Sequence, residues 1–409
     1  MKQKFTDKFL TKKRALVTMF IFYIFIFAIV VNLFKVMIIK GEEYYAIAED
    51  QWTSSVKIQA RRGSILDRNL KELAVSANVY RVDLDLKTIR EYLEKNSMTY
   101  EDIAVKIAEA LDMNVEKVLK DLKISGVIIS PDTKRYYPNN SYLSHVLGST
   151  DIDGKGLTGI ELIYDDELTG VDGFRIVELD AKSRDLPYSI SEYIDPIDGK
   201  NVVLTIDEKI QFFAEKAANQ ALIDNKAKAV SIIVTNPENG EILAMVNKPD
   251  FNPNTVRDEV ATYDELQKLW RNRSVNDIYE PGSIFKIITS IAAIEEGIIS
   301  DKDSFVCDGH KEVGGRIIHC WKRTGHGTQN FAQILQNSCN VGFMEIGERL
   351  GAETLNKYIK KFGFGEKTQL DLPGEAKGII KKTENISSVD LATISFGQTN
   401  ASTPIQILT

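Results

Sequence analysis

The sequence predicts an α+β fold that follows a single membrane-spanning helix. Three features support this: an apolar N-terminal stretch, a β-hairpin signal near residue 240, and helix-forming segments after it. A chain of 409 residues is too long for one ordinary domain, so we expect two or three. Hydrophobic content of 43% and charged content of 27% are typical of a globular chain. A net charge of −7, with no basic stretch interleaved with aromatic residues, disfavours a nucleic-acid binder.

The N-terminal segment has the composition of a signal anchor. Six basic residues and one acid lie in residues 1–14, and residues 15–34 are nearly all apolar. A helix of about 20 residues spans the ~30 Å hydrocarbon core of a membrane. The run is too long for a cleaved signal peptide, and the basic flank places the N-terminus in the cytoplasm. We therefore predict a cytoplasmic tail at 1–14, a transmembrane anchor at 15–39 and an extracytoplasmic remainder.

The next part of the chain, to residue 195, has the pattern of a mixed α/β domain. Gly63 and the Asp-Arg-Asn cluster at 67–69 are turn chemistry between short extended pieces. Residues 80–86 alternate between apolar and polar, as in a strand. Residues 99–113 form an amphipathic pattern that predicts a helix with Thr99 as its N-cap.

Two charged clusters in this domain have alternative interpretations. Arg61 and Arg62 bind an acidic partner or anionic lipid, or they form a structural ion pair with Asp67 or Glu72. The acidic run at 165–167 is interpreted as a solvated loop and not as a metal site.

A second domain is predicted over residues 196–409. The β-branched run at 201–206 is typical of a buried strand, and Asp207 caps a helix over 208–223. Apolar runs at 231–235 and 241–246 are joined by a segment that ends in Asn-Gly, which predicts a hairpin.

Helices follow this hairpin. Residues 284–296 and 341–350 have helical patterns, and a glycine comes directly after each. A hairpin with several helices after it predicts an antiparallel sheet with helices packed on it.

The strongest candidate site is the tetrad Ser283-Ile284-Phe285-Lys286, which opens a predicted helix. Residues three apart share a helix face, so Lys286 lies beside Ser283. A serine hydroxyl needs a neighbour that takes its proton, and a lysine kept neutral by burial and by the helix dipole can do so. A second match at 54–57 lies just outside the membrane without a helix start, and we interpret it as a chance match.

A second motif is Ser338-Cys339-Asn340. Residues two apart face the same way in an extended or tightly turned segment, so Ser338 and Asn340 can both reach the serine. The hydroxyl can relay a proton, and the amide can hold lysine or substrate. Taken alone, such a motif is more often a helix cap. The order of the two motifs, both beyond the hairpin, favours the catalytic interpretation.

With these motifs in order, the chain resembles class B penicillin-binding proteins from about residue 61 to its end. The segments that carry the resemblance are R-G-S-I-L-D-R-N at 62–69, L-T-I-D at 204–207, N-G-E-I-L-A-M at 239–245, Y-E-P-G-S at 279–283, H-G at 326–327, S-C-N at 338–340, S-F-G-Q at 395–398 and T-P-I-Q at 403–406. The resemblance implies an elongated pedestal or dimerisation-type domain at 40–195 and a penicillin-binding transpeptidase domain at 196–409.

The resemblance also implies the chemistry. Ser283 attacks the D-Ala-D-Ala amide of a peptidoglycan stem peptide and forms an acyl-enzyme, which an amine of a neighbouring stem resolves into a cross-link. Lys286, Ser338 and Asn340 complete the catalytic set, and β-lactam antibiotics acylate the same serine. The S-F-G-Q segment places Gly397 and Gln398 at the substrate. The implied partner is a membrane glycan polymerase of the shape, elongation, division and sporulation family, and no cofactor is expected.

One family feature is missing. No Lys-Thr-Gly sequence occurs in the chain, and the nearest match, at 323–325, lies between the first two motifs. We therefore expect a transpeptidase domain without its C-terminal part, as in a fragment or an incomplete gene. Two other functions stay open: a catalytically incomplete scaffold of the cell-wall synthesis complex, and a β-lactam sensor or serine β-lactamase. Fourteen cytoplasmic residues are too few for a sensor, and no deacylating base for a hydrolase is visible.

Three cysteines, Cys307, Cys320 and Cys339, lie in the extracytoplasmic part, where disulfides persist. Three histidines lie within 310–326, so a zinc site is an alternative, but the spacing fits no common zinc module and no metal is predicted. A disulfide is favoured. Pairing Cys307 with Cys320 would staple a loop, whereas pairing Cys320 with Cys339 would place a redox-sensitive bond inside the second motif.

Overall fold

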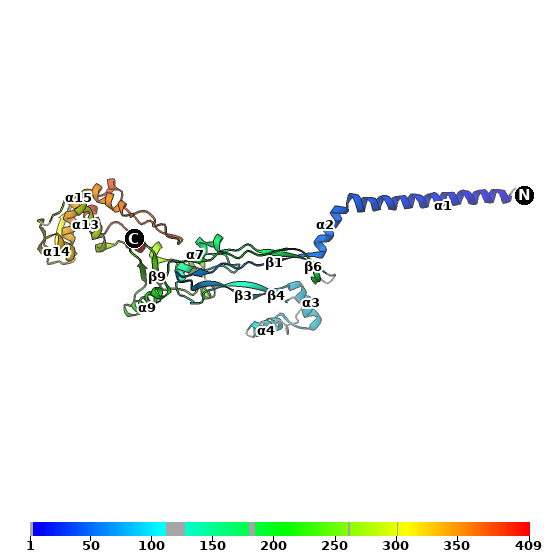
Figure 1. The fold of residues 1–409 in the computed structure, drawn as a ribbon, viewed down its shortest axis with the longest axis horizontal. Coiled ribbons are helices and arrows are strands. Elements are labelled where there is room, and N and C mark those ends of the chain that lie inside the picture. The colour runs from blue at the N-terminus through cyan, green and yellow to red at the C-terminus, as the bar shows by residue number, and fades with distance from the viewer. Residues whose placement is uncertain (1–2, 112–126, 180–184, 261, 301) are drawn as a thin grey trace. The chain divides into compact units, whose positions relative to one another are not determined.

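The computed structural model describes residues 3–111, 127–179, 185–260, 262–300 and 302–409 (Figure 1). Contacts divide the chain into two units: unit 1 comprises residues 1–60 and 171–197, and unit 2 comprises 61–170 and 198–409. The region between the anchor and residue 195 thus contributes to both units. The predicted domains are continuous stretches of the sequence, whereas these units are defined by contacts and combine separate stretches. The predicted boundaries therefore stay a prediction.

Unit 1 begins with a long apolar helix. Helix α1 (Gln3–Phe34) continues through a π-helical turn, η1 (Lys35–Ile39), into α2 (Gly41–Trp52). The stretch Lys12–Ile39 has a mean hydropathy of 2.6 and none of it is buried, so by length and composition it can cross a membrane. This agrees with the predicted single-pass anchor. The rest of unit 1 is an antiparallel sheet in the order β1 (Thr53–Ile58), β5 (Gly173–Leu179), β6 (Asp185–Ile194).

Unit 2 begins with a four-stranded sheet whose order is β4-β3-β2-β7. The predicted strand at 80–86 is the end of a longer one, β3, and two helices follow it. In the second of these, Asp102 N–H donates to Thr99 Oγ1 at 3.3 Å, so Thr99 caps the helix as predicted. The helix is described to Leu111, and the predicted end at residue 113 lies outside the described residues. The bounds are β2 (Ile65–Leu66), β3 (Glu72–Leu84), α3 (Leu86–Asn96), α4 (Tyr100–Leu111), β4 (Val127–Tyr136) and β7 (Val202–Val203).

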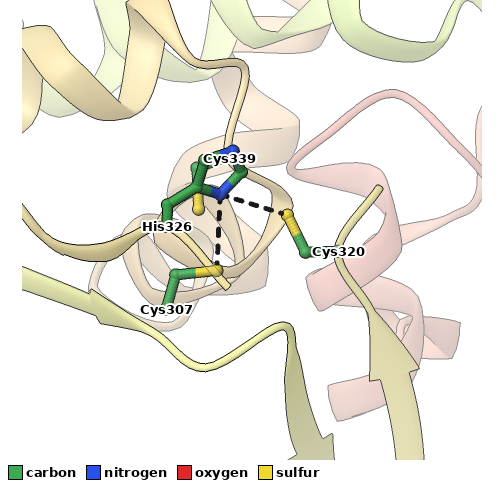
Figure 2. A group of neighbouring side chains, drawn as sticks. All are labelled: Cys307, Cys320, His326 and Cys339. Atoms are coloured by element: carbon green, nitrogen blue, oxygen red, sulfur yellow. Dashed lines mark hydrogen bonds between the residues drawn. The ribbon is translucent and has the colours of Figure 1, made fainter. Parts of the chain in front are cut away.

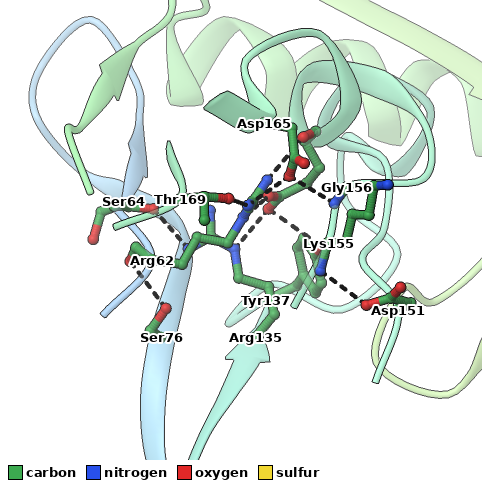
Figure 3. Close-up of polar contacts among 12 residues, drawn as sticks. Arg62, Ser64, Ser76, Arg135, Tyr137, Asp151, Lys155, Gly156, Asp165 and Thr169 are labelled. Carbon is green, nitrogen blue, oxygen red and sulfur yellow. Dashed lines mark hydrogen bonds and ion pairs between the residues drawn. The ribbon is translucent and has the colours of Figure 1, made fainter. Parts of the chain in front are cut away.

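Three short helices follow β4: α6 (Ser144–Leu147), α7 (Gly159–Ile163) and α8 (Asp165–Leu168). A buried ion cluster joins the sheet to α7 and α8 (Figure 3). The Glu161 carboxylate is fully buried and accepts from Arg62 Nε at 2.8 Å and from Arg135 Nε at 2.6 Å. Arg62 also pairs with Asp165 at 2.7 Å. The predicted partners Asp67 and Glu72 were therefore wrong.

Asp67 and Asp165 have different roles from those predicted, which explains the change of ion-pair partners. Asp67 Oδ1 accepts from the backbone N–H groups of Asn69 and Lys71, each at 2.8 Å, and so closes the predicted turn. Asp165 opens helix α8 and is not part of a solvated loop, which corrects the interpretation of the acidic run.

The predicted hairpin is present and carries a helix on one face. Strands β8 (Val230–Thr235) and β9 (Ile242–Lys248) pair antiparallel, and Asp207 caps α9 (Glu208–Asp224) through Lys209 N–H. Gln211 of α9 bonds both backbone groups of Met245, at 2.8 and 3.1 Å, which fixes the helix to the strand. The predicted strand at 201–206 shortens to β7, because only its first part pairs with β2.

The rest of unit 2 combines helices with two pairs of short antiparallel strands, and its main group of buried apolar side chains contains Phe285, Phe343 and Ile346. The helix predicted at 284–296 begins at Lys286 after a 3-10 turn, and the second predicted helix breaks at Gly351 (φ +74°), as expected. The bounds are α10 (Val256–Glu259), α11 (Tyr263–Trp270), α12 (Arg273–Asn276), η2 (Gly282–Phe285), α13 (Lys286–Glu295), β10 (Phe305–Cys307), β11 (His310–Val313), β12 (Arg316–His319), β13 (Gly327–Gln329), α14 (Phe331–Gln336), α15 (Asn340–Lys361), η3 (Thr383–Asn385), α16 (Ser388–Ile394) and α17 (Pro404–Leu408).

Candidate active site

Ser283 lies on the 3-10 turn η2, and not in the first turn of an α-helix as predicted. A 3-10 turn has three residues per turn, so residues three apart still lie on one face. Lys286 begins α13, and its Nζ lies 3.1 Å from Ser283 Oγ. The predicted pairing of the two side chains is therefore present, although the element that carries the serine differs.

The second motif reaches the same lysine. Ser338 lies in the connection between α14 and α15 with a φ of +48°, and Asn340 begins α15. Lys286 Nζ is 2.9 Å from Ser338 Oγ, 2.8 Å from the Ser338 carbonyl oxygen and 2.8 Å from Asn340 Oδ1. The outer residues of the motif thus face one way, as predicted, while Cys339 between them is fully buried.

The electrostatics of Lys286 follow from this set of partners. Its side chain is 1% exposed, and its four polar contacts are all to uncharged oxygen atoms. Within the described part of the chain no carboxylate forms an ion pair with it, and the centroid of the Phe343 ring lies 5.4 Å from Nζ. Burial disfavours the ammonium form and lowers the pKa of Lys286 to about 8.

Gly397 supports the turn that carries the serine. Its carbonyl oxygen accepts from Gly282 N–H at 2.7 Å. Gly397 has a φ of +89°, and a Cβ there would lie 2.0 Å from the Gly282 oxygen, so the close approach requires glycine. Gln398 is exposed. The predicted substrate contacts of both residues stay a prediction.

The tetrad at 54–57 has a different geometry. It lies on strand β1 in unit 1, and not at the start of a helix. Lys57 Nζ pairs instead with Asp172 at 2.6 Å. This arrangement agrees with its interpretation as a chance match.

A second cluster adjoins the second motif. Cys307, Cys320, His326 and Cys339 place their sulfur and ring nitrogen atoms within 4.8 Å of one another (Figure 2). All three cysteines are free thiols, which differs from the predicted disulfide, and burial raises the pKa of the Cys339 thiol to about 11. These four residues are the ones in the described chain that can hold a metal.

Spacing in the sequence did not identify this cluster, because it grouped histidines that are close in sequence but not in space. His310 and His319 are exposed and face each other across the β11–β12 hairpin, with ring centroids 6.1 Å apart, and neither belongs to the cluster. Cys339, nineteen positions after Cys320, does belong. Sequence reasoning also missed Trp321, whose exposed indole donates to the Asn337 carbonyl at 3.0 Å beside the second motif. No periodicity or motif in the sequence signals the place of Cys339 in the cluster or the hydrogen bond of Trp321.

Two family models match the chain: the penicillin-binding protein dimerisation domain over residues 119–204 and the penicillin binding protein transpeptidase domain over residues 230–409. Stage V sporulation protein D of Bacillus subtilis is 38% identical over 421 residues, which cover 97% of this chain and 64% of that relative. Peptidoglycan D,D-transpeptidase FtsI of Buchnera aphidicola is 30% identical over 414 residues, which cover 94% of this chain and 70% of that relative. The chain therefore spans roughly two thirds of the length of these curated relatives.

Solved structures agree with this relationship. Penicillin-binding protein PBP2 of Helicobacter pylori, in complex with MreC, has a TM-score of 0.66 and 27% identity, covering 87% of this chain and 75% of that one. Penicillin binding protein 3 of Mycobacterium tuberculosis, complexed with aztreonam, has a TM-score of 0.63 and 26% identity, covering 86% and 63%. The chain belongs to the class B penicillin-binding protein family, as its motifs predicted.

Proposed function

We propose that this chain is a serine-type peptidoglycan D,D-transpeptidase that cross-links stem peptides and binds β-lactams covalently. The observation that carries the proposal is the contact of Ser283 Oγ with Lys286 Nζ at 3.1 Å, with the lysine buried among uncharged oxygens. A lysine with a pKa of about 8 has a useful neutral fraction near neutral pH and can act as a general base.

The acylation step follows from this geometry. Neutral Lys286 takes the proton of Ser283 as Oγ attacks the carbonyl carbon of the D-Ala-D-Ala amide. The carbon–nitrogen bond breaks, and the departing D-alanine amine needs a proton. Ser338 Oγ, 2.9 Å from Nζ, is placed to relay that proton from the lysine. In a β-lactam the same attack opens the ring, and the leaving nitrogen stays attached to the acyl group.

The second step reverses the proton flow. An amine of a neighbouring stem peptide attacks the ester carbon and loses a proton, which passes through Ser338 to the neutral Lys286. The bond to Ser283 Oγ breaks, and the oxygen takes that proton from Lys286. Asn340 Oδ1, 2.8 Å from Nζ, holds the lysine in line throughout. We assign the substrate contacts to Gly397 and Gln398, which adjoin the serine turn through the Gly282–Gly397 hydrogen bond.

The setting of the reaction is the outer face of a membrane. The basic flank before the apolar helix supports a cytoplasmic N-terminus, a tail at 1–14 and an anchor at 15–39. We assign residues 40–195 to the pedestal and 196–409 to the transpeptidase domain. The Helicobacter pylori relative forms a complex with MreC, which supports a protein partner for this chain. We propose that this partner is a membrane glycan polymerase and that it binds the pedestal.

A catalytically incomplete scaffold of the cell-wall synthesis complex is the second candidate function. Labelling with a fluorescent penicillin separates the two. We expect labelling of the wild-type chain and of Ser54→Ala, and none of Ser283→Ala. A folded wild-type chain that takes no label would overturn the transpeptidase proposal and leave the scaffold.

A further inference from the structure

The second cluster collects its four side chains from four separate places in unit 2 (Figure 2). Cys307 ends β10, Cys320 directly follows β12, His326 directly precedes β13, and Cys339 directly precedes α15. Backbone bonds hold these ends together: His326 N–H donates to the Cys307 carbonyl, and Cys320 N–H donates to the Gly309 carbonyl, each at 2.9 Å. The convergence is therefore built into the backbone and does not depend on flexible side chains.

Two glycines allow this backbone path. Gly309 and Gly325 have φ values of +89° and +80°. A Cβ on Gly309 would lie 2.0 Å from the Arg323 oxygen, and one on Gly325 would lie 2.3 Å from the Cys307 oxygen. Only glycine fits at both positions, because each combines left-handed backbone with close backbone contact. The backbone between Cys307 and His326 is thus shaped so that Cys307, Cys320 and His326 come together.

The distances in the cluster match those of a tetrahedral metal site. His326 Nδ1 lies 3.5 Å from Cys307 Sγ and 3.7 Å from Cys320 Sγ. Zinc bonds of about 2.3 Å to sulfur and about 2.0–2.1 Å to nitrogen, at tetrahedral angles, place sulfur and nitrogen about 3.6 Å apart. The four donor atoms lie within 4.8 Å of one another, with no sulfur–sulfur bond formed.

The environment suits metal-bound thiolates. The three cysteines are at most 1% exposed. Gly342 N–H donates to the sulfur of Cys339 at 3.5 Å. Donors of this kind stabilise negative charge on sulfur, which thiol ligands must carry. Three sulfurs and one imidazole form a soft donor set that favours zinc-class metals over magnesium or calcium.

We propose that Cys307, Cys320, His326 and Cys339 bind one divalent transition metal of the zinc class. Four protein ligands fill a tetrahedral shell, so the site is structural and the metal does not contact substrate. Cys339 is the middle residue of Ser338-Cys339-Asn340, and its neighbours hold Lys286 through three hydrogen bonds. The metal therefore fixes the turn that positions the lysine. This second role rests on the proposed transpeptidase function, whereas the metal site itself does not.

The test is the metal content of the 409-residue chain, purified in detergent under reducing conditions. We expect about one zinc per chain by elemental analysis, as a four-ligand structural site requires. Cobalt in its place should give the intense visible bands of a tetrahedral ion and a thiolate charge-transfer band. The site would be overturned by a reduced, folded chain that binds neither metal. It would also be overturned by a Cys320–Cys339 disulfide that persists under reducing conditions with excess zinc.

A matched pair of histidine variants tests the ligand assignment. His326→Ala should weaken zinc binding by more than about 100-fold, since loss even of outer-shell partners costs 10–100-fold. His319→Ala is the control, because that ring is exposed next to Cys320 in sequence but outside the cluster. It should keep wild-type metal content and the cobalt spectrum. Equal loss in the two variants would contradict the assignment.

The positioning role has its own readout. Removing zinc from the wild-type chain with a chelator should slow acylation by a fluorescent penicillin about tenfold or more, as expected for an outer-shell contact of the reacting groups. Adding zinc back should restore the rate, and neither treatment should change the rate of His326→Ala. Metal loss with an unchanged rate would overturn the positioning role while leaving the site. A metal-bound chain that is never acylated would instead overturn the transpeptidase proposal.

Discussion

Among the described residues of unit 2, two lysines are buried, and they differ in the charge of their partners. Lys248, at the end of β9, is 4% exposed, and its Nζ pairs with Glu215 at 2.6 Å and also with Asp250. Lys286, at the start of α13, is 1% exposed and touches only uncharged oxygens. Burial acts to lower both pKa values. The carboxylates of Asp250 and Glu215 outweigh it and raise the pKa of Lys248, whereas the pKa of Lys286 falls to about 8.

The difference shows what separates a structural lysine from one that can move a proton. A buried ammonium with two carboxylates stays charged at all ordinary pH values and holds its partners in place. A buried lysine with only neutral acceptors changes charge near neutral pH, as a general base must. The cluster of Arg62, Arg135, Glu161 and Asp165 belongs with Lys248 in this respect, because its two cations pair with two carboxylates inside the fold.

Among variants that test this comparison of the two lysines, we expect the largest loss of acylation rate from Lys286→Met. Acylation by a fluorescent penicillin should slow by about 10²–10⁴-fold, the usual contribution of a general base. The melting temperature should stay unchanged or rise, because methionine fills the space without an unpaired buried charge. Stopped-flow acylation and thermal unfolding measure the two effects. A slow variant with a strongly lowered melting temperature would mean that Lys286 is mainly structural.

The matched change Lys248→Met should instead lower the stability of the fold and leave the acylation rate unchanged. Lys248→Met leaves Glu215 and Asp250, which are 12% and 26% exposed, without their cation. We expect a loss of about 2–4 kcal/mol in the free energy of unfolding, somewhat reduced because Asp250 reaches solvent. Denaturant unfolding gives this value. The acylation rate per folded molecule should not change, and a fall comparable to that of Lys286→Met would remove the distinction between the two lysines.

A smaller effect is expected from Asn340→Ala. It removes the 2.8 Å hydrogen bond from Lys286 Nζ to Oδ1 and should slow acylation about tenfold, the value of one net hydrogen bond of ~1–1.5 kcal/mol. Asn337→Ala is the control, since its amide donates to Gln329 at 2.8 Å and not to Lys286. The ratio of the two acylation rates is the measurement. Equal rates would show that Asn340 does not position the lysine.

Much of the fold follows from local patterns in the sequence. The β8–β9 hairpin, the Asp207 cap and the helix break at Gly351 were predicted because each depends on residues that are neighbours in the chain. The contacts among the proposed catalytic residues were also predicted, because the spacing of Ser283 to Lys286 encodes a contact within one turn, and the family resemblance linked the pair to Ser338 and Asn340.

What the sequence could not predict depends on contacts between distant residues. Arg62 pairs with Glu161, ninety-nine positions away, while the nearer Asp67 serves its own turn. The loop carrying Cys307, Cys320 and His326 closes on Cys339 through backbone bonds that no spacing rule describes. The division into units is likewise set by β5, which returns to pair with β1 after more than a hundred residues.

The central claim is that Lys286 works as a neutral base at Ser283, and the pH dependence of acylation tests it most directly. The neutral fraction of a lysine rises tenfold for each pH unit below its pKa and levels off above it. With a pKa of about 8, the second-order rate constant for penicillin acylation should rise between pH 6 and 8 and reach a plateau above. The plateau should be absent in Lys286→Met. A wild-type rate constant that stays level across pH 6–9, or that falls as pH rises, would contradict the account.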